Sequence, residues 1–320
     1  MSRSKSELRD ASGLSYPELR KRLTPRFWRV WLELGLANLL LLALPLGLVF
    51  AQRLLPLEAA LALGVVGAWA IGYVLAFIML FFHEAAHYNV APSRGLNDLL
   101  TNLAIGGWVG QDIRTYRPIH WAHHRELGTT RDTERTYFKP LNWSFVLESM
   151  LGVKVAQVLF GRREALGGSQ AVERPADAHP LRQLLFGLAL NATICGALTW
   201  LGAWVALGAW VLGVLSIYPL FGALRQLLEH RAADASLEVD YAQVDHGEVN
   251  RMFGVGPLAS TFGGAGFNRH FLHHWDPQLS YTRLAELERF LLETGFAEEI
   301  ETRRTSYLRA ARELRRGGRG

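Results

Sequence analysis

Cysteine is almost absent from this chain of 320 residues, because Cys195 is the only one. A single cysteine cannot form an intrachain disulfide, and it excludes metal sites and iron–sulfur clusters that need several thiolates. Charged residues are also scarce, at 20% of the sequence against about 25% in soluble proteins. Half of the residues are hydrophobic. These proportions are typical of a membrane protein whose apolar segments are separated by polar ones.

Two further patterns are missing. No cleavable signal precedes the first apolar run, which begins near Trp31 after a polar, charged stretch. No stretch alternates aromatic residues with lysine or arginine, as a single-strand nucleic-acid binder would. The net charge of +5 is therefore interpreted as a signal of membrane topology, and no nucleic-acid partner is expected.

Four apolar runs are long enough to cross a bilayer, which takes about 20 helical residues. They cover residues 31–51, 57–82, 184–203 and 207–228. Short turns join the first run to the second and the third to the fourth. The sequence therefore predicts an all-α integral membrane fold of two helical hairpins. The expected parts are a basic tail at 1–29, a membrane domain at 30–295 and a polar tail at 296–320.

Basic residues are unevenly distributed between the polar segments. They are concentrated in 1–29 and in 88–180, whereas the first connecting turn holds only Arg53 and the second holds none. The positive-inside rule then places both termini and the long polar segment in the cytoplasm. We expect a multi-pass membrane protein with a helical cap on its cytosolic side.

Eight of the eleven histidines fall into three clusters with helical spacing. The clusters are His83/His87, His120/His123/His124 and His270/His273/His274. Residues three and four apart lie on one helical face, so each cluster can point at one object. Neutral imidazole is the commonest metal ligand, which favours a metal site in the cap. His230 joins the set because it follows the fourth apolar run on the same side of the membrane.

Two interpretations of the metal remain open from the residues alone. The segment His83-Glu84-Ala85-Ala86-His87 matches the H-E-x-x-H pattern of zinc proteases, in which the glutamate is the general base. One catalytic zinc needs about three protein ligands, which leaves the other two clusters unexplained. Nine imidazoles fit two metal ions better. Imidazole suits zinc, copper, iron and nickel, so composition does not identify the metal.

In order and spacing, the three clusters resemble the histidine boxes of the membrane fatty acid desaturase/hydroxylase superfamily. The resemblance runs from about Trp31 to Leu292, and Asn268-Arg269 precede the third box. It implies a centre of two histidine-coordinated ferrous ions that activates O2 and attacks an unactivated C–H bond of a lipid-like chain. It also implies a further histidine after the fourth span, which His230 fits. Some acyl desaturases have asparagine four residues before this histidine, where the present chain has Gln226.

The resemblance implies a membrane oxidoreductase that introduces a double bond into a fatty-acyl or related lipid chain. The alternatives are a hydroxylase or ketolase of a lipid, carotenoid or sterol-like substrate and, more distantly, a membrane zinc protease. The sequence has no His-Pro-Gly-Gly stretch of a cytochrome b5-like domain. Electrons are therefore expected from a separate protein, such as a ferredoxin or a cytochrome with its reductase.

Several polar residues near the boxes are candidates for hydrogen bonds that orient the imidazoles. They are Glu84, Glu126, Asp132, Gln226, Glu229 and Asn268. No catalytic residue beyond the metal ligands is expected.

Overall fold

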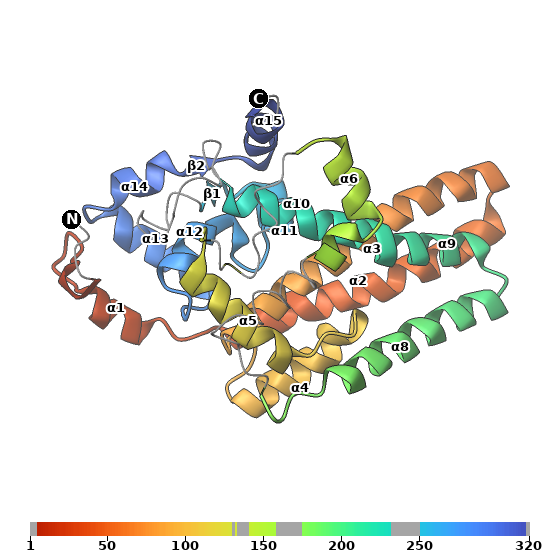
Figure 1. Cartoon of the computed structure of the whole chain (residues 1–320), viewed down its shortest axis with the longest axis horizontal. Coiled ribbons are helices and arrows are strands. Elements are labelled where there is room, and N and C mark those ends of the chain that lie inside the picture. The colour runs from red at the N-terminus through yellow and green to blue at the C-terminus, as the bar shows by residue number, and fades with distance from the viewer. Residues whose placement is uncertain (1–4, 130–131, 133–140, 158–174, 232–249, 318–320) are drawn as a thin grey trace.

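The computed structural model describes residues 5–129, 132, 141–157, 175–231 and 250–317. Figure 1 shows long helices extending together toward the right, and shorter helices gathered with both marked chain ends on the other side. Helices dominate the described residues, and the strands in them are two residues long. The predicted helical class is therefore confirmed.

Among the described residues, four helices are long and apolar enough to cross a membrane, as predicted. They are α2 (Phe27–Leu54), α3 (Leu57–Ala86), α8 (Pro180–Trp200) and a fourth span, Trp204–His230. Three of them continue past the apolar runs, and α8 is shifted by a few residues toward the N-terminus. The reason is that apolar composition marks what hydrocarbon covers, whereas backbone hydrogen bonds continue a helix into the cap. Box one consequently lies at the end of α3, with His83 inside the helix and His87 as its C-cap.

The fourth span is not a regular helix. It consists of α9 (Trp204–Leu212), the π-helical turn η4 (Gly213–Ile217) and α10 (Tyr218–His230). The π turn packs tightly against α3: a Cβ added to Gly72 would lie 2.6 Å from the Ile217 side chain and 2.9 Å from the Gly213 carbonyl. A π turn shifts the helical phase of the residues that follow it, and such turns are frequent at functional sites. It therefore determines the direction from which His230 enters the cap.

Shorter elements lie before, between and after the spans, and together they are called the cap. They are α1 (Tyr16–Arg22), α4 (Arg94–Ala104), η2 (Gly106–Trp108), α5 (Ile113–Glu126), α6 (Trp143–Met150), α11 (Pro257–Thr261), η6 (Phe267–Arg269), α12 (His270–Trp275), η7 (Tyr281–Arg283) and α13 (Leu284–Leu292). Both α4 and α6 expose apolar side chains, among them Leu99, Leu103, Trp143 and Leu147. Such helices suit the membrane surface, where one face meets hydrocarbon.

The segment expected to be a polar tail takes part in the packing. It forms α14 (Ala297–Thr302), β2 (Arg304–Thr305) and α15 (Tyr307–Gly317), and β2 pairs in parallel with β1 (Met252–Phe253). The ring of Tyr307 stacks on Phe253 at 3.8 Å between centroids, and Ala310 and Leu314 are buried beside it. The packed structure thus continues beyond residue 295.

The close approach of α3 and η4 should not tolerate a larger side chain. We expect Gly72→Leu to destabilise the protein by about 1–3 kcal/mol or more, because overpacking forces neighbouring backbone apart. The measurement is the midpoint temperature for loss of the monodisperse protein in detergent. Gly47→Leu in α2 is the matched control, since no atom lies within 4 Å of its added Cβ. An equal loss in both variants would contradict the assignment of tight packing to Gly72.

Candidate metal centre

Box one is held to box two by an arginine that sequence reasoning did not single out. Arg117 on α5 donates from Nε to the Ala86 carbonyl (3.1 Å) and from Nη2 to the Ala85 carbonyl (3.2 Å). These carbonyls belong to the last turn of α3, where the regular i+4 donors end, and Tyr88 N also donates to the Ala85 carbonyl at 3.1 Å. The guanidinium is itself paired with the buried carboxylate of Asp98. The ends of α3 and α5 are therefore fixed relative to each other.

The other two boxes lie on short cap helices. Asp112 caps the N-terminus of α5 by accepting a hydrogen bond from Arg114 N (3.0 Å). Box three begins α12, where Phe271 N donates to the Arg251 carbonyl at 3.2 Å. His230 reaches the same place from the end of the fourth span. Four chain segments that are distant in sequence thus meet at one point.

The structure brings all nine predicted histidines together. Two groups have ligand atoms within 4.8 Å of one another: His83, His87, His120, His124 and His273 form the first, and His123, His230 and His274 form the second. His270 adjoins the second group, because its Nε2 lies 2.7 Å from Nε2 of His230 and 3.1 Å from Nε2 of His274. The division into two groups could accommodate two metal ions.

The distances between ring nitrogens fit shared metal ions better than hydrogen bonds. Nε2 of His120 lies 2.9 Å from Nε2 of His87 and 3.0 Å from Nε2 of His124. A neutral ring nitrogen carries either one hydrogen or one lone pair, so it cannot form both contacts as hydrogen bonds. Two imidazoles that bind one ion at about 2.1 Å each have nitrogens about 3.0–3.4 Å apart, for bond angles between square and tetrahedral. A cation accounts for both contacts.

The protonation of the rings agrees with metal binding. Burial, followed by the charge of Arg117, lowers the pKa of His87 to about 3. Burial, followed by the neighbouring histidines, also lowers the pKa of His120 and His273 well below the usual value. Both ring nitrogens of His83 are buried and have no hydrogen-bond partner in the described part of the chain. The cluster is therefore a set of neutral imidazoles whose nitrogens are available to a cation.

Three neighbours fix the orientation of individual rings. Asp132 Oδ1 lies 2.7 Å from His123 Nδ1, the Gln226 carbonyl lies 3.1 Å from His230 Nδ1, and the Tyr116 hydroxyl lies 3.2 Å from His120 Nδ1. A hydrogen on Nδ1 that is donated to oxygen leaves Nε2 as the free ligand atom. Of the candidate orienting residues, Asp132 touches a histidine through its side chain and Gln226 through its backbone.

Two other candidates brace the elements that carry the boxes. Glu84 accepts a hydrogen bond from Tyr281 N (3.1 Å), and its carboxylate is 3.9 Å from Nδ1 of His83. Glu229 accepts one from the Tyr307 hydroxyl (2.9 Å) and pairs with Arg225 Nε at 3.4 Å. Glu84 thus ties α3 to the segment after box three, and Glu229 ties α10 to α15.

The remaining two candidates have different partners. Asn268 donates to the Gly254 carbonyl at 3.3 Å, and Glu126 accepts from the Thr129 hydroxyl at 3.3 Å. Tyr116 and Arg117 stand four and three residues before His120, so helical spacing could have indicated them. No local pattern could have indicated Tyr307, which is 78 residues from Glu229.

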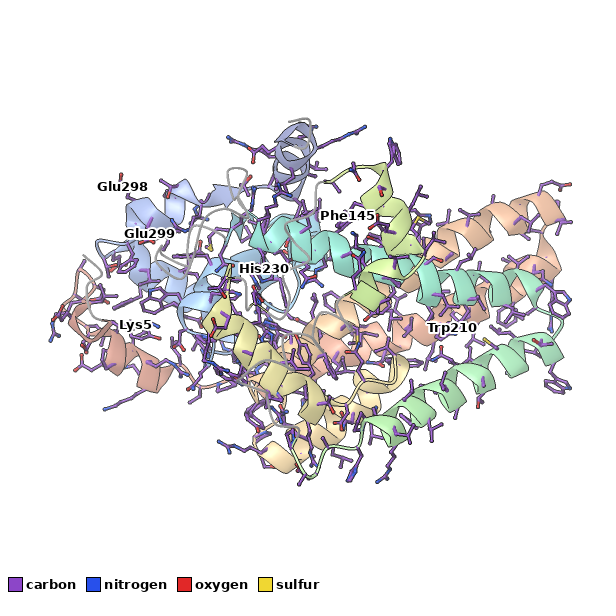
Figure 2. The ribbon with its side chains drawn as sticks, viewed as in Figure 1. Lys5, Phe145, Trp210, His230, Glu298 and Glu299 are labelled. Carbon is purple, nitrogen blue, oxygen red and sulfur yellow. The ribbon has the colours of Figure 1, made fainter. Side chains whose placement is uncertain are left out.

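A cavity of about 650 Å³ leads from the histidines into the spans. His83, His120, His123, His230 and His270 line its inner end, and Trp108, Asn191 and Trp210 line the other. In Figure 2, His230 lies where the fourth span meets the cap, and Trp210 lies much farther along that span. The two residues are twenty positions apart, which corresponds to about 30 Å of helix.

At the far end of the cavity, Asn191 bridges two tryptophans through hydrogen bonds. Asn191 accepts from Trp210 Nε1 (3.1 Å) and donates to the Trp108 carbonyl (3.0 Å). Trp108 in turn donates from Nε1 to Asn38 (2.8 Å). Buried indoles need a partner for their N–H groups, and the asparagines supply it without charge. The cavity is therefore mainly apolar, and its lining far from the histidines is held by these hydrogen bonds.

Four helices long and apolar enough to span a membrane and two largely buried histidine groups are the architecture expected of a membrane metalloprotein. The sequence profile described as Fatty acid desaturase matches residues 59–306, a range that contains all nine histidines. The chain belongs to this family, whose members are oxidoreductases with a di-iron centre. The comparison with curated proteins gives no match.

Removing a boxed histidine should reduce the metal content of the purified protein. We expect His124→Ala and His274→Ala to bind less metal than the unmodified chain, which has two groups of ligands. Elemental analysis of protein purified after expression in iron-supplemented cells measures the change. His179→Ala serves as the control, because His179 is exposed and lies in neither group. Unchanged metal content in both cluster variants would argue against a histidine-bound centre.

The contact between Asp132 and His123 gives a separate expectation. Asp132→Asn keeps the size of the side chain but removes the charge that supports the ring. We expect metal affinity to fall by about 10–100-fold, as for other residues that orient metal-bound histidines. Competition with a chelator of known affinity measures it. A loss confined to one of two metal equivalents would fit this residue best, because only the second group contains His123.

Proposed function

We propose that this protein is an integral membrane di-iron oxygenase that introduces a double bond into a fatty-acyl or related lipid chain. It would use O2 and electrons from a separate donor. The observation that carries this proposal is the long, mainly apolar cavity that leads from five of the nine histidines into the interior of the spans. Membership of the desaturase family supports the reaction class.

The residues of the site would have three roles: binding metal, directing the substrate chain and orienting the imidazole rings. The nine histidines would hold two iron ions, which, when bound, supply the oxidation of a C–H bond by O2. Ala76, Met79 and Leu80 of α3 line the cavity beside the histidines and would direct an alkyl chain past them. Asp132 and the Gln226 carbonyl would hold the protons on Nδ1 of two rings. Burial of the cluster would exclude water from the reacting carbon.

We also propose that the termini and the metal centre face the cytoplasm, which the distribution of basic residues supports. The donor, such as a ferredoxin or a cytochrome with its reductase, would then dock on the cap. Trp121 would offer a route for electrons from the donor to the histidines. It is half-buried, and its ring centroid lies 4.8 Å from that of His87 and 5.9 Å from that of His124.

The geometry around Glu84 disfavours the zinc-protease alternative. A general base must reach a water on the metal, whereas the buried Glu84 carboxylate accepts a hydrogen bond from the Tyr281 backbone. Hydroxylation or ketolation would use the same ligands and differ in how the substrate is placed. The product therefore distinguishes these alternatives from desaturation.

The test is mass spectrometry of lipids from a bacterial host with and without the expressed protein. We expect fatty-acyl species that have lost two hydrogens, and their absence when His124→Ala is expressed at the same level. An added oxygen would assign the protein to the hydroxylase alternative. Unchanged lipids in cells that supply iron, O2 and a suitable donor would contradict the proposal.

The tryptophan pair at the far end of the cavity should limit the length of the chain. We expect Trp210→Leu to shift products toward longer chains, because the smaller side chain extends the space and frees Asn191. Trp200→Leu is the control, since Trp200 is 86% exposed and does not line the cavity. The ratio of long to short products measures the effect. An equal ratio in the Trp210 variant and the control would mean that the cavity end does not contact substrate.

A further inference from the structure

The third span is loosely attached to the rest of the bundle. Only 17% of the apolar window of α8 is buried, and the helix packs mainly against η2 and α9. Figure 1 shows that α8 and the fourth span are nearest where α8 leads into α9 and that they diverge in the other direction. In the part of the chain that the structure describes, α8 and α10 therefore make little contact, and the cavity is also lined there by Phe145 of α6 and by Val155.

The cavity extends into this divergence. Leu188 of α8 and Leu215 of the fourth span both line the cavity, and they are 58% and 64% exposed on the surface of the bundle. Residues that belong at once to a cavity wall and to the outer surface mark the place where the cavity opens. Both side chains are apolar, so a hydrocarbon chain could pass them without losing hydration of polar groups.

A glycine stands at the inner edge of this opening. Gly222 lines the cavity, is exposed, and has no atom within 4 Å of the position that a Cβ would occupy. It precedes His230 by eight residues, or about 12 Å along the helix. The exposed lining thus runs from Leu188 and Leu215, which are within five residues of Asn191 and Trp210, to Gly222, which lies nearer the histidines.

We propose that the substrate chain reaches the histidines sideways from the bilayer, through the opening between α8 and α10. The inference rests on the proposed function, and it names the substrate class as a hydrocarbon chain already resident in the membrane. A chain carried by a water-soluble protein or thioester does not fit this route, because its polar carrier would have to enter hydrocarbon. Such entry is costly for groups without hydrogen-bond partners.

The labelling rate of a buried thiol can test the route without catalytic turnover. Ala76 lines the cavity from α3 and is 5% exposed, so Ala76→Cys in a Cys195→Ser chain places the only thiol where reagents must cross the cavity. The protein would be reconstituted in phosphatidylcholine vesicles. N-dodecylmaleimide, which dissolves in the bilayer, should label this thiol at least about tenfold faster than a sulfonated maleimide in water, because the apolar chain concentrates in hydrocarbon.

Closing the opening should slow the bilayer reagent selectively. Gly222→Trp, added to the reporter chain, should reduce labelling by N-dodecylmaleimide several-fold, and Gly222→Leu should have a smaller effect. Gly208→Trp is the matched control: Gly208 is also exposed and unobstructed in the fourth span but does not line the cavity. Elution as a single species in gel filtration confirms that each variant is folded.

The outcomes separate the route from the reaction. Faster labelling from water, or labelling that Gly222→Trp does not slow in the folded variant, would overturn the lateral route even if the lipid product forms. Labelling from the bilayer that Gly222→Trp blocks would support the route, and an absent lipid product would then count against the proposed reaction alone. If the route and the reaction are both as proposed, Gly222→Trp should lower product formation and Gly208→Trp should not.

Discussion

The structure depends on the convergence of neutral imidazole nitrogens in a buried space. Each ring nitrogen offers one hydrogen or one lone pair, yet Nε2 of His120 and of His270 each meet two other imidazole nitrogens at 2.7–3.1 Å. Burial keeps such rings neutral, so no ion pair can compensate them. A cation in each group resolves the conflict, and metal binding then contributes to the stability of the cap, because the unfolded chain has no such site.

The fold has to hold the four chain segments that carry these histidines in fixed positions relative to one another. Helix ends perform this task, because they carry backbone groups without helical partners. Arg117 takes the last carbonyls of α3, and Glu84 takes the Tyr281 N–H of the segment that follows box three. On the other side, Glu229 joins α10 to Tyr307 of α15. The cap is therefore an assembly of braced helix ends around the histidines, and residues after 295 belong to it.

The sequence predicted what depends on local spacing. The boxed histidines follow from helical periodicity, the spans from apolar length, and His230 from its position after the fourth run. The bracing contacts could not be predicted in this way, because Arg117 and Asp98 are 19 residues apart and Tyr307 is 78 residues from Glu229. The π turn could not be predicted from the sequence either. Its residues are about as apolar as their neighbours, and its geometry comes from packing against α3.

The cavity depends both on local sequence spacing and on long-range packing. Its inner end is lined by histidines that helical periodicity predicts. Its far end is lined by Trp108, Asn191 and Trp210, which come together only when α8 and the fourth span pack. The same packing leaves α8 loosely attached toward the cap, where Leu188 and Leu215 are both wall and surface. In water such an apolar opening would collapse or aggregate, whereas in a bilayer hydrocarbon fills it at no cost in hydration. On the proposed route, the membrane would form part of the binding site: the gap that weakens the bundle as a closed core would also be the way by which an alkyl chain reaches the histidines.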